Sequence, residues 1–172
     1  AYQNGRKLGD IPVEDISEYV KRPDCFVWVA LFEPSSAELD KMAEEFSLHP
    51  LAVEDARKGH QRPKIEEYQD SLFAVVHTVE QGPEGADEPL RVGEVAMFTG
   101  ENYLLSVRMH TTKGFADVRA RTEREPELLR GRIEVNHASI HGKKGDILEQ
   151  GVHCSTERLL DFPCLADAEV LF

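Results

Sequence analysis

The sequence predicts an α/β fold with a central sheet that is not all parallel. A continuous apolar run from Cys25 to Phe32 is typical of a strand buried on both faces, as in sheets that are covered by helices. A capped amphipathic helix follows at Ser35 to Phe46. Two later apolar stretches flank Gly100-Glu101-Asn102, which indicates a hairpin. Strands and helices are therefore mixed along the chain, as they are in layered α/β domains.

Two short elements precede the first long strand. Asn4-Gly5 is the strongest two-residue turn signal, so Tyr2 to Leu8 is predicted to form a small hairpin. A short helix is expected over Pro12 to Val20, because proline suits the first turn of a helix.

The next two helices carry the clearest local signals. Ser35 and Glu38 have the spacing of a capping box, in which each residue's side chain bonds the other's backbone N–H. Apolar residues then recur at positions i, i+3, i+4 and i+7: Leu39, Met42, Ala43 and Phe46. Pro50 suits the first turn of a second helix, which is expected to run to about Arg57.

Three further strands are predicted after these helices. Ile65 to Val79 is strand-like and is interrupted near Gln69-Asp70, with Leu72 to Val79 as its more apolar half. The strands of the hairpin are expected over Val92 to Thr99 and Tyr103 to Val107.

The remaining segments are less regular. Gln81 to Pro89 contains two glycines, two prolines and three acids, a composition that predicts a solvated loop. Helical spacing returns at Phe115 to Glu125, where Phe115 and Val118 mark the apolar face. The periodicity of Pro126 to Phe172 is too weak to predict any element.

Composition excludes several classes of function. The 172 residues suffice for one domain with its own core, and the apolar runs are shorter than the roughly 20 residues that a membrane-spanning helix needs. The net charge of −12 argues against nucleic acid and anionic lipid as partners, and it attracts divalent cations. Three cysteines without a Cys-x-x-Cys pair, and no signal-peptide pattern, favour a reducing cytosolic compartment.

Glu54 and Asp55 are the candidate metal ligands. On a helix, consecutive side chains point about 100° apart, so these two carboxylates cannot readily clamp one ion together. Each therefore needs an oxygen donor from another element or another subunit. Mg²⁺ suits such an arrangement, because it binds through one or two carboxylates and keeps most of its waters. The alternative is an ordinary solvated helix face with two acids.

A polar segment, His60 to Lys64, follows this helix. It is interpreted as a turn in which Pro63 ends the helix and begins an extended strand. An anion site is the alternative, but the segment lacks the glycine-rich loop that cradles phosphate.

The C-terminal part offers a second candidate metal site. His137 and His141 have the i, i+4 spacing of a helical metal-binding pair, and His153, Cys154 and Cys164 are further potential zinc ligands. Glycines at 142 and 145 disfavour that helix, so surface histidines are the favoured interpretation. No nucleophile elbow, His-Glu-x-x-His or dinucleotide fingerprint is present, so we expect no enzyme activity.

The string HPLAVEDARKGHQRPKIEEYQDSLFAVVHTV, from His49 to Val79, resembles the signature stretch of the cytoplasmic domain of CorA magnesium transporters. The resemblance extends upstream through Phe26 to Val29 and the helix at Ser35 to Phe46. Downstream it continues through Asn102 to Arg108 and ends at Leu129, in the order of the family.

This resemblance implies an α/β/α sandwich with a mixed central sheet. It also implies a homopentameric magnesium channel, which often passes Co²⁺ or Ni²⁺ as well, with identical subunits as partners. The domain would lie at the cytoplasmic face of the inner (plasma) membrane. Carboxylates at the positions of Asp55, first, and Glu54, second, would bind regulatory Mg²⁺ weakly at subunit interfaces.

The chain also departs from the family. It lacks the Gly-Met-Asn motif and any pore helix, so we expect it not to conduct and to reach the membrane only through C-terminal helices outside this sequence. Residues 1–129 are accordingly predicted to be the CorA-like sensor domain, and residues 130–172 a divergent segment of unknown role. The acidic partners of the family's sensing sites lie in the region that this segment replaces, which leaves Glu54 and Asp55 as half-sites.

Two other functions stay open at this point. One is the cytoplasmic domain of a proton-coupled, ZntB-like zinc transporter, which shares the fold. The other is a stand-alone metal-binding protein whose histidine- and cysteine-containing tail holds zinc.

Overall fold

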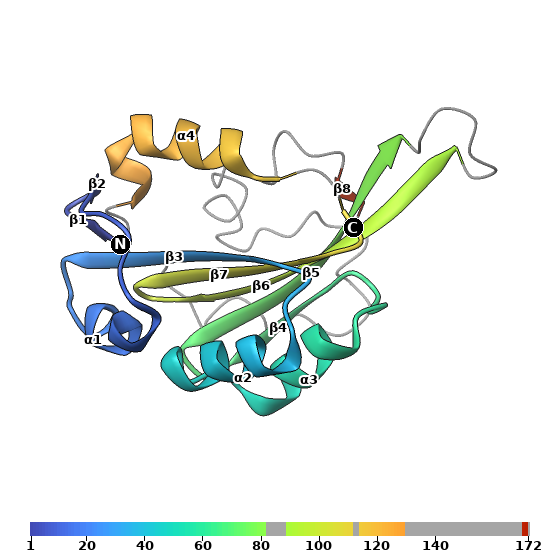
Figure 1. The fold of residues 1–172 in the computed structure, drawn as a ribbon, viewed down its shortest axis with the longest axis horizontal. Coiled ribbons are helices and arrows are strands. Elements are labelled where there is room, and N and C mark those ends of the chain that lie inside the picture. Colours follow the sequence, from blue (N-terminus) through green and yellow to red (C-terminus); the bar gives the residue numbers. More distant parts are fainter. Residues whose placement is uncertain (82–88, 112–113, 130–169, 172) are drawn as a thin grey trace, which may run out of the picture.

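The structure is a computed structural model that describes residues 1–81, 89–111, 114–129 and 170–171 (Figure 1). In chain order the elements are β1 (Tyr2–Gln3), β2 (Arg6–Lys7), the 3₁₀ helix η1 (Val13–Asp15), α1 (Ile16–Val20), β3 (Cys25–Phe32), α2 (Ser36–Glu45), α3 (Pro50–Lys58), β4 (Lys64–Tyr68), β5 (Ser71–Gln81), β6 (Leu90–Gly100), β7 (Tyr103–Met109), α4 (Ala116–Arg124), the 3₁₀ helix η2 (Pro126–Leu129) and β8 (Val170–Leu171). The predicted helices and strands are thus confirmed, most of them to within one or two residues.

One mixed sheet organises these elements. Its strands lie in the order β2-β1-β3-β7-β6-β5-β4, and β8 pairs with β5 beyond the end of β4. β3 and β7 are parallel, with Val27 opposite Tyr103, whereas the pairings β4–β5, β5–β6 and β6–β7 are antiparallel. The expectation of a sheet that is not all parallel is therefore confirmed.

Helices cover both faces of the sheet, which makes the fold an α/β/α sandwich as expected. In Figure 1, α1, α2 and α3 lie below the sheet and α4 lies above it. The lower core joins Ile16 and the buried faces of α2 and α3 to alternate strand residues such as Phe73 and Leu105. The upper core packs Val118 of α4, together with Tyr2, on the opposite face of the same strands.

Strand β3 is less buried than its apolar sequence predicts. Cys25, Phe26 and Val27 are buried, but Phe32 is 52% exposed. The physical reason is pairing: β1 pairs with Cys25 and Phe26 alone, so among the described residues the rest of β3 has a neighbour on one edge only. The prediction of a strand is right, and the prediction that both faces are buried along its whole length is wrong.

Local signals set the ends of the elements. Ser35 Oγ accepts from the Glu38 N–H at 3.3 Å and Glu38 Oε2 accepts from the Ser35 N–H at 2.8 Å, which confirms the capping box of α2. The β1–β2 turn has φ of 49° at Asn4 and 78° at Gly5, as the Asn-Gly signal requires. Gln69, with φ of 54°, turns the chain between β4 and β5.

The predicted loop at Gln81 to Pro89 and the segment 130–172 lie largely outside the described residues. In the described part of the chain, no helix combines the length and the apolar character needed to cross a membrane.

Candidate functional site

Helix α3 presents the two predicted metal ligands. His49 caps the N-terminus of the helix, and its Nδ1 accepts from the Leu51 N–H at 3.3 Å. Ala52, Val53 and Ala56 are buried against the sheet, so the intervening acids turn outward. The Glu54 side chain is 54% exposed, and the Asp55 side chain, closer to the sheet, is 25% exposed.

The two carboxylates point to different partners. Glu54 Oε1 lies 2.5 Å from the Nζ of Lys58, one helical turn onward. Asp55 Oδ2 lies 2.5 Å from the Nζ of Lys64, at the start of β4. Neighbouring acids on this helix therefore diverge, as helix geometry requires, and each already contacts an ammonium group of the same chain.

Lys64 connects Asp55 to a second carboxylate. Its Nζ also lies 2.9 Å from Glu66 Oε2, which in turn accepts from the Tyr68 hydroxyl at 2.9 Å. Burial by itself would lower the pKa of Lys64, but the hydrogen bonds that its ammonium donates to Asp55 and Glu66 outweigh burial and raise the pKa. The Lys64 side chain is therefore a fixed cation on the outer face of α3 and β4.

The chain reversal before Lys64 is held by tertiary contacts. Gly59 ends α3 with φ of 60°, and His60 follows with φ of 56°, so two consecutive residues adopt left-handed φ values. The backbone of Gln61 is then bonded on both sides: its N–H donates to Glu94 Oε2 at 2.8 Å, and its carbonyl lies 2.8 Å from His77 Nε2. These bonds hold the segment that leads into β4, which begins at Lys64 as expected. The helix ends at Gly59, however, so the prediction that Pro63 ends it is wrong.

The described residues alone do not form a complete cation site. Within residues 1–81, 89–111, 114–129 and 170–171, no three His, Cys, Asp or Glu side chains gather in a metal-binding arrangement. Helix α3 offers Glu54 and Asp55 as separate carboxylates, each already paired with a lysine, where Mg²⁺ needs six oxygen donors. The alternative zinc ligands named above, His137, His141, His153, Cys154 and Cys164, lie outside the described residues.

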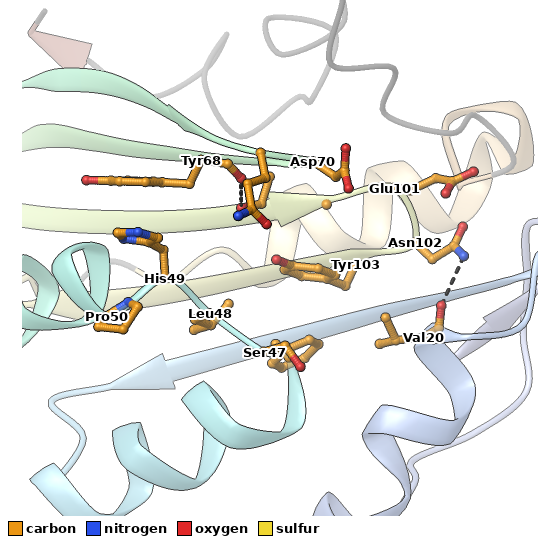
Figure 2. Close-up of a pocket in the computed structure, with 14 residues that line it drawn as sticks. Val20, Ser47, Leu48, His49, Pro50, Tyr68, Asp70, Glu101, Asn102 and Tyr103 are labelled. Carbon is orange, nitrogen blue, oxygen red and sulfur yellow. Dashed lines mark hydrogen bonds between the residues drawn. The ribbon is translucent and has the colours of Figure 1, made fainter.

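A pocket of about 420 Å³ lies at the other end of β4 (Figure 2). The end of α1, the α2–α3 connection and the turns β4–β5 and β6–β7 line it. At one side of the pocket His49 stacks on Tyr68, with ring centroids 4.1 Å apart. At the other side Asn102 Nδ2 donates to the Val20 carbonyl at 3.0 Å. Asp70 and Glu101, both exposed, also line this pocket.

Sequence reasoning missed the partners of Asp55. Lys64 is nine residues away and Glu66 is on a strand, so no helical or strand periodicity relates either of them to Asp55. The signal that was available is the abrupt end of α3 at Gly59 followed by Pro63, which indicates that the chain folds back beside the helix.

Comparisons with known proteins match most of the chain. The family model described as CorA-like Mg²⁺ transporter protein matches residues 24–140. The putative metal ion transporter YfjQ of Bacillus subtilis is 34% identical over 124 residues, which are 72% of this chain and 36% of that protein. The magnesium transporter ALR1 of Saccharomyces cerevisiae is 31% identical over 111 residues, which are 63% of this chain and 12% of that protein.

A solved structure, the soluble domain of CorA from Methanocaldococcus jannaschii, is similar at 19% identity with a TM-score of 0.43, over 69% of this chain and 40% of that chain. The chain spans about a third of the length of the Bacillus relative. The family match includes α3, β4 and both predicted ligands. This chain belongs to the family of CorA-like Mg²⁺ transporter proteins.

Proposed function

We propose that this chain is the cytoplasmic divalent-cation-sensing domain of a CorA-type magnesium and cobalt transporter. The observation that carries the proposal is the match of the CorA-like family model to residues 24–140, a range that includes α3 with Glu54 and Asp55. The family is one of transporters, and the role proposed for this domain within it is regulation rather than catalysis. In this proposal the pore is not part of this chain, which matches 36% of the length of its Bacillus relative.

In this proposal the domain works as a ring of identical subunits, a homopentamer, at the cytoplasmic face of the inner membrane. Asp55 supplies the first carboxylate and Glu54 the second, and the remaining oxygen donors come from a neighbouring subunit and from water. The outward placement of both acids on α3 supports this arrangement, because a neighbouring chain can reach them.

The net charge of the subunits indicates which state bound cations favour. Each chain carries a net charge of −12, so packed subunits repel each other until cations neutralise the acids at their contacts. A substantial shift between open and closed rings requires a few kcal/mol of differential binding, which several weak sites supply together. Mg²⁺ is the primary cation, and Co²⁺ or Ni²⁺ are the secondary ones.

The first test measures the stability of this chain with MgCl₂. For a dissociation constant of about 1 mM, 10 mM Mg²⁺ stabilises the fold by about 1.4 kcal/mol. For a chain of this size, that raises the Tm by about 3 to 6 °C. Asp55→Asn should lose this rise, whereas Glu44→Gln, which removes an exposed charge on α2, should keep it. Ionic strength is matched with NaCl.

The second test uses the complete transporter that the proposal predicts. Mg²⁺ on the cytoplasmic side should inhibit the current, and Asp55→Ala should weaken that inhibition more than Glu54→Ala does. If both variants retain the inhibition of the parent protein, these two acids are not the sensor.

A further inference from the structure

The Lys64 ammonium contacts one carboxylate oxygen of Asp55, the first of the two proposed ligands. Its Nζ lies 2.5 Å from Asp55 Oδ2 and 2.9 Å from Glu66 Oε2, so two carboxylate oxygens converge on one ammonium nitrogen. The Lys64 and Asp55 side chains are each only 25% exposed, and Glu66 is 38% exposed. Solvent therefore screens this pair less than it screens a fully exposed ion pair.

The ammonium is held in place by more than its charge. Lys64 Nζ lies 5.6 Å from the centroid of the Phe73 ring on the neighbouring strand. The backbone three residues earlier, at Gln61, is bonded to Glu94 and to His77. A group tethered this close to its partner acts as if it were present at millimolar concentration or above. The Lys64 ammonium is therefore available to compete with a cation that is sensed in the millimolar range.

Glu54 provides a natural contrast on the same helix. Its partner Lys58 is 63% exposed, and the carboxylate itself is 54% exposed. The pair is an ordinary i, i+4 contact on a helix surface, which stabilises a helix by only a few tenths of a kcal/mol. Water and salt compete with Lys58 far more readily than with Lys64.

We propose that Lys64 sets the divalent-cation affinity of Asp55 by competing for its carboxylate from within the same chain. This inference rests on the proposed sensing role of Asp55. A divalent cation reaches Asp55 only when the Lys64 ammonium gives way, so the resident lysine raises the concentration at which Asp55 responds. Glu54, whose lysine is exposed, carries no comparable threshold.

The test compares Mg²⁺ dissociation constants of this chain by isothermal titration calorimetry with MgCl₂ at fixed ionic strength. Lys64→Met removes the charge and keeps an apolar stem beside Phe73. We expect this variant to bind Mg²⁺ about tenfold more tightly, a difference of about 1.4 kcal/mol. Lys58→Met is the matched control, and its dissociation constant should stay within twofold of the parent value. The double variant Lys64→Met with Asp55→Asn should lose the gain.

Two failures are distinguishable. Suppose that Asp55→Asn weakens Mg²⁺ binding, but the dissociation constant of Lys64→Met stays within twofold of the parent value or rises above it. The competition is then refuted, and the sensing role of Asp55 stands. If Asp55→Asn has no effect with either residue at position 64, Asp55 is not a ligand, and both proposals fall. Circular dichroism checks that each variant is folded, and each titration is run well below the Tm of the variant. Lys64→Gln, a second substitution that removes the charge, should show the same gain in Mg²⁺ affinity. A gain in Lys64→Met that persists with Asp55→Asn also refutes the competition.

Discussion

Removing one hydroxyl group, in Tyr2→Phe, should loosen the attachment of α4 to the sheet. Tyr2 is 1% exposed on β1, and its hydroxyl donates to Glu123 Oε1 at 2.7 Å. The Tyr2 hydroxyl oxygen accepts from Arg119 Nε at 3.0 Å, and Arg119 Nε also donates to Glu123 Oε1 at 3.2 Å. Phenylalanine keeps the ring in the upper core and loses both hydrogen bonds. The substitution therefore isolates the polar link between β1 and α4, which are far apart in the sequence and adjacent in the fold.

The expected loss follows from these contacts. Hydrogen bonds to charged groups contribute about 1.5 to 3 kcal/mol each. The side chains of Arg119 and Glu123 are 38% and 33% exposed, so in the variant water can replace part of the two hydrogen bonds that the Tyr2 hydroxyl made to them. We therefore expect the free energy of unfolding at pH 7 to fall by about 1 to 2 kcal/mol. Urea denaturation followed by circular dichroism measures this difference.

The pH dependence provides a second readout. Burial, and then the hydrogen bond to Glu123, raise the pKa of Tyr2 from 10.0 to about 12. Because the folded pKa lies above the unfolded one, this contribution to stability is complete below pH 10 and is lost as the pH rises toward 12. The gap between the parent protein and Tyr2→Phe should therefore narrow above pH 10. Tyr19→Phe, at a half-buried tyrosine on α1, is the control and should differ by less than about 0.5 kcal/mol. A variant as stable as the parent at pH 7, or a gap that widens in alkali, would refute this reasoning.

Three other substitutions test the fold. Ser35→Ala removes the capping box of α2 and should cost about 1 kcal/mol in urea denaturation; an unchanged midpoint would show that the cap is not needed. Leu105→Ala, at a side chain with no exposed surface in the lower core, should cost about 2 to 5 kcal/mol, and a loss below about 1 kcal/mol would contradict the packing described above. Gly93→Ala places a Cβ 2.6 Å from Thr111 Cβ and 2.7 Å from Thr78 Oγ1, so thermal denaturation should report a loss of about 1 to 3 kcal/mol; a stabilised variant would contradict that contact.

The elements of this fold are largely predictable from sequence, because the signals for them are local. The Asn4-Gly5 turn, the Ser35 capping box and the proline at the start of α3 each act within about four residues of where they stand. The break at Gln69-Asp70 likewise separates β4 from β5 as expected. The divergence of Glu54 and Asp55 also follows from helix geometry, since it depends on nothing outside the helix.

The partners of these elements were decided only by the tertiary structure. Nothing local pairs Val27 with Tyr103 in parallel, or leaves Phe32 half exposed on a strand that, among the described residues, is paired there on one edge only. Asp55 meets Lys64 because the chain reverses after Gly59 and is held there by Glu94 and His77, which come from two later strands. Periodicity and capping describe a few neighbouring residues, whereas the charge environment of a carboxylate depends on which distant segments the packing brings beside it.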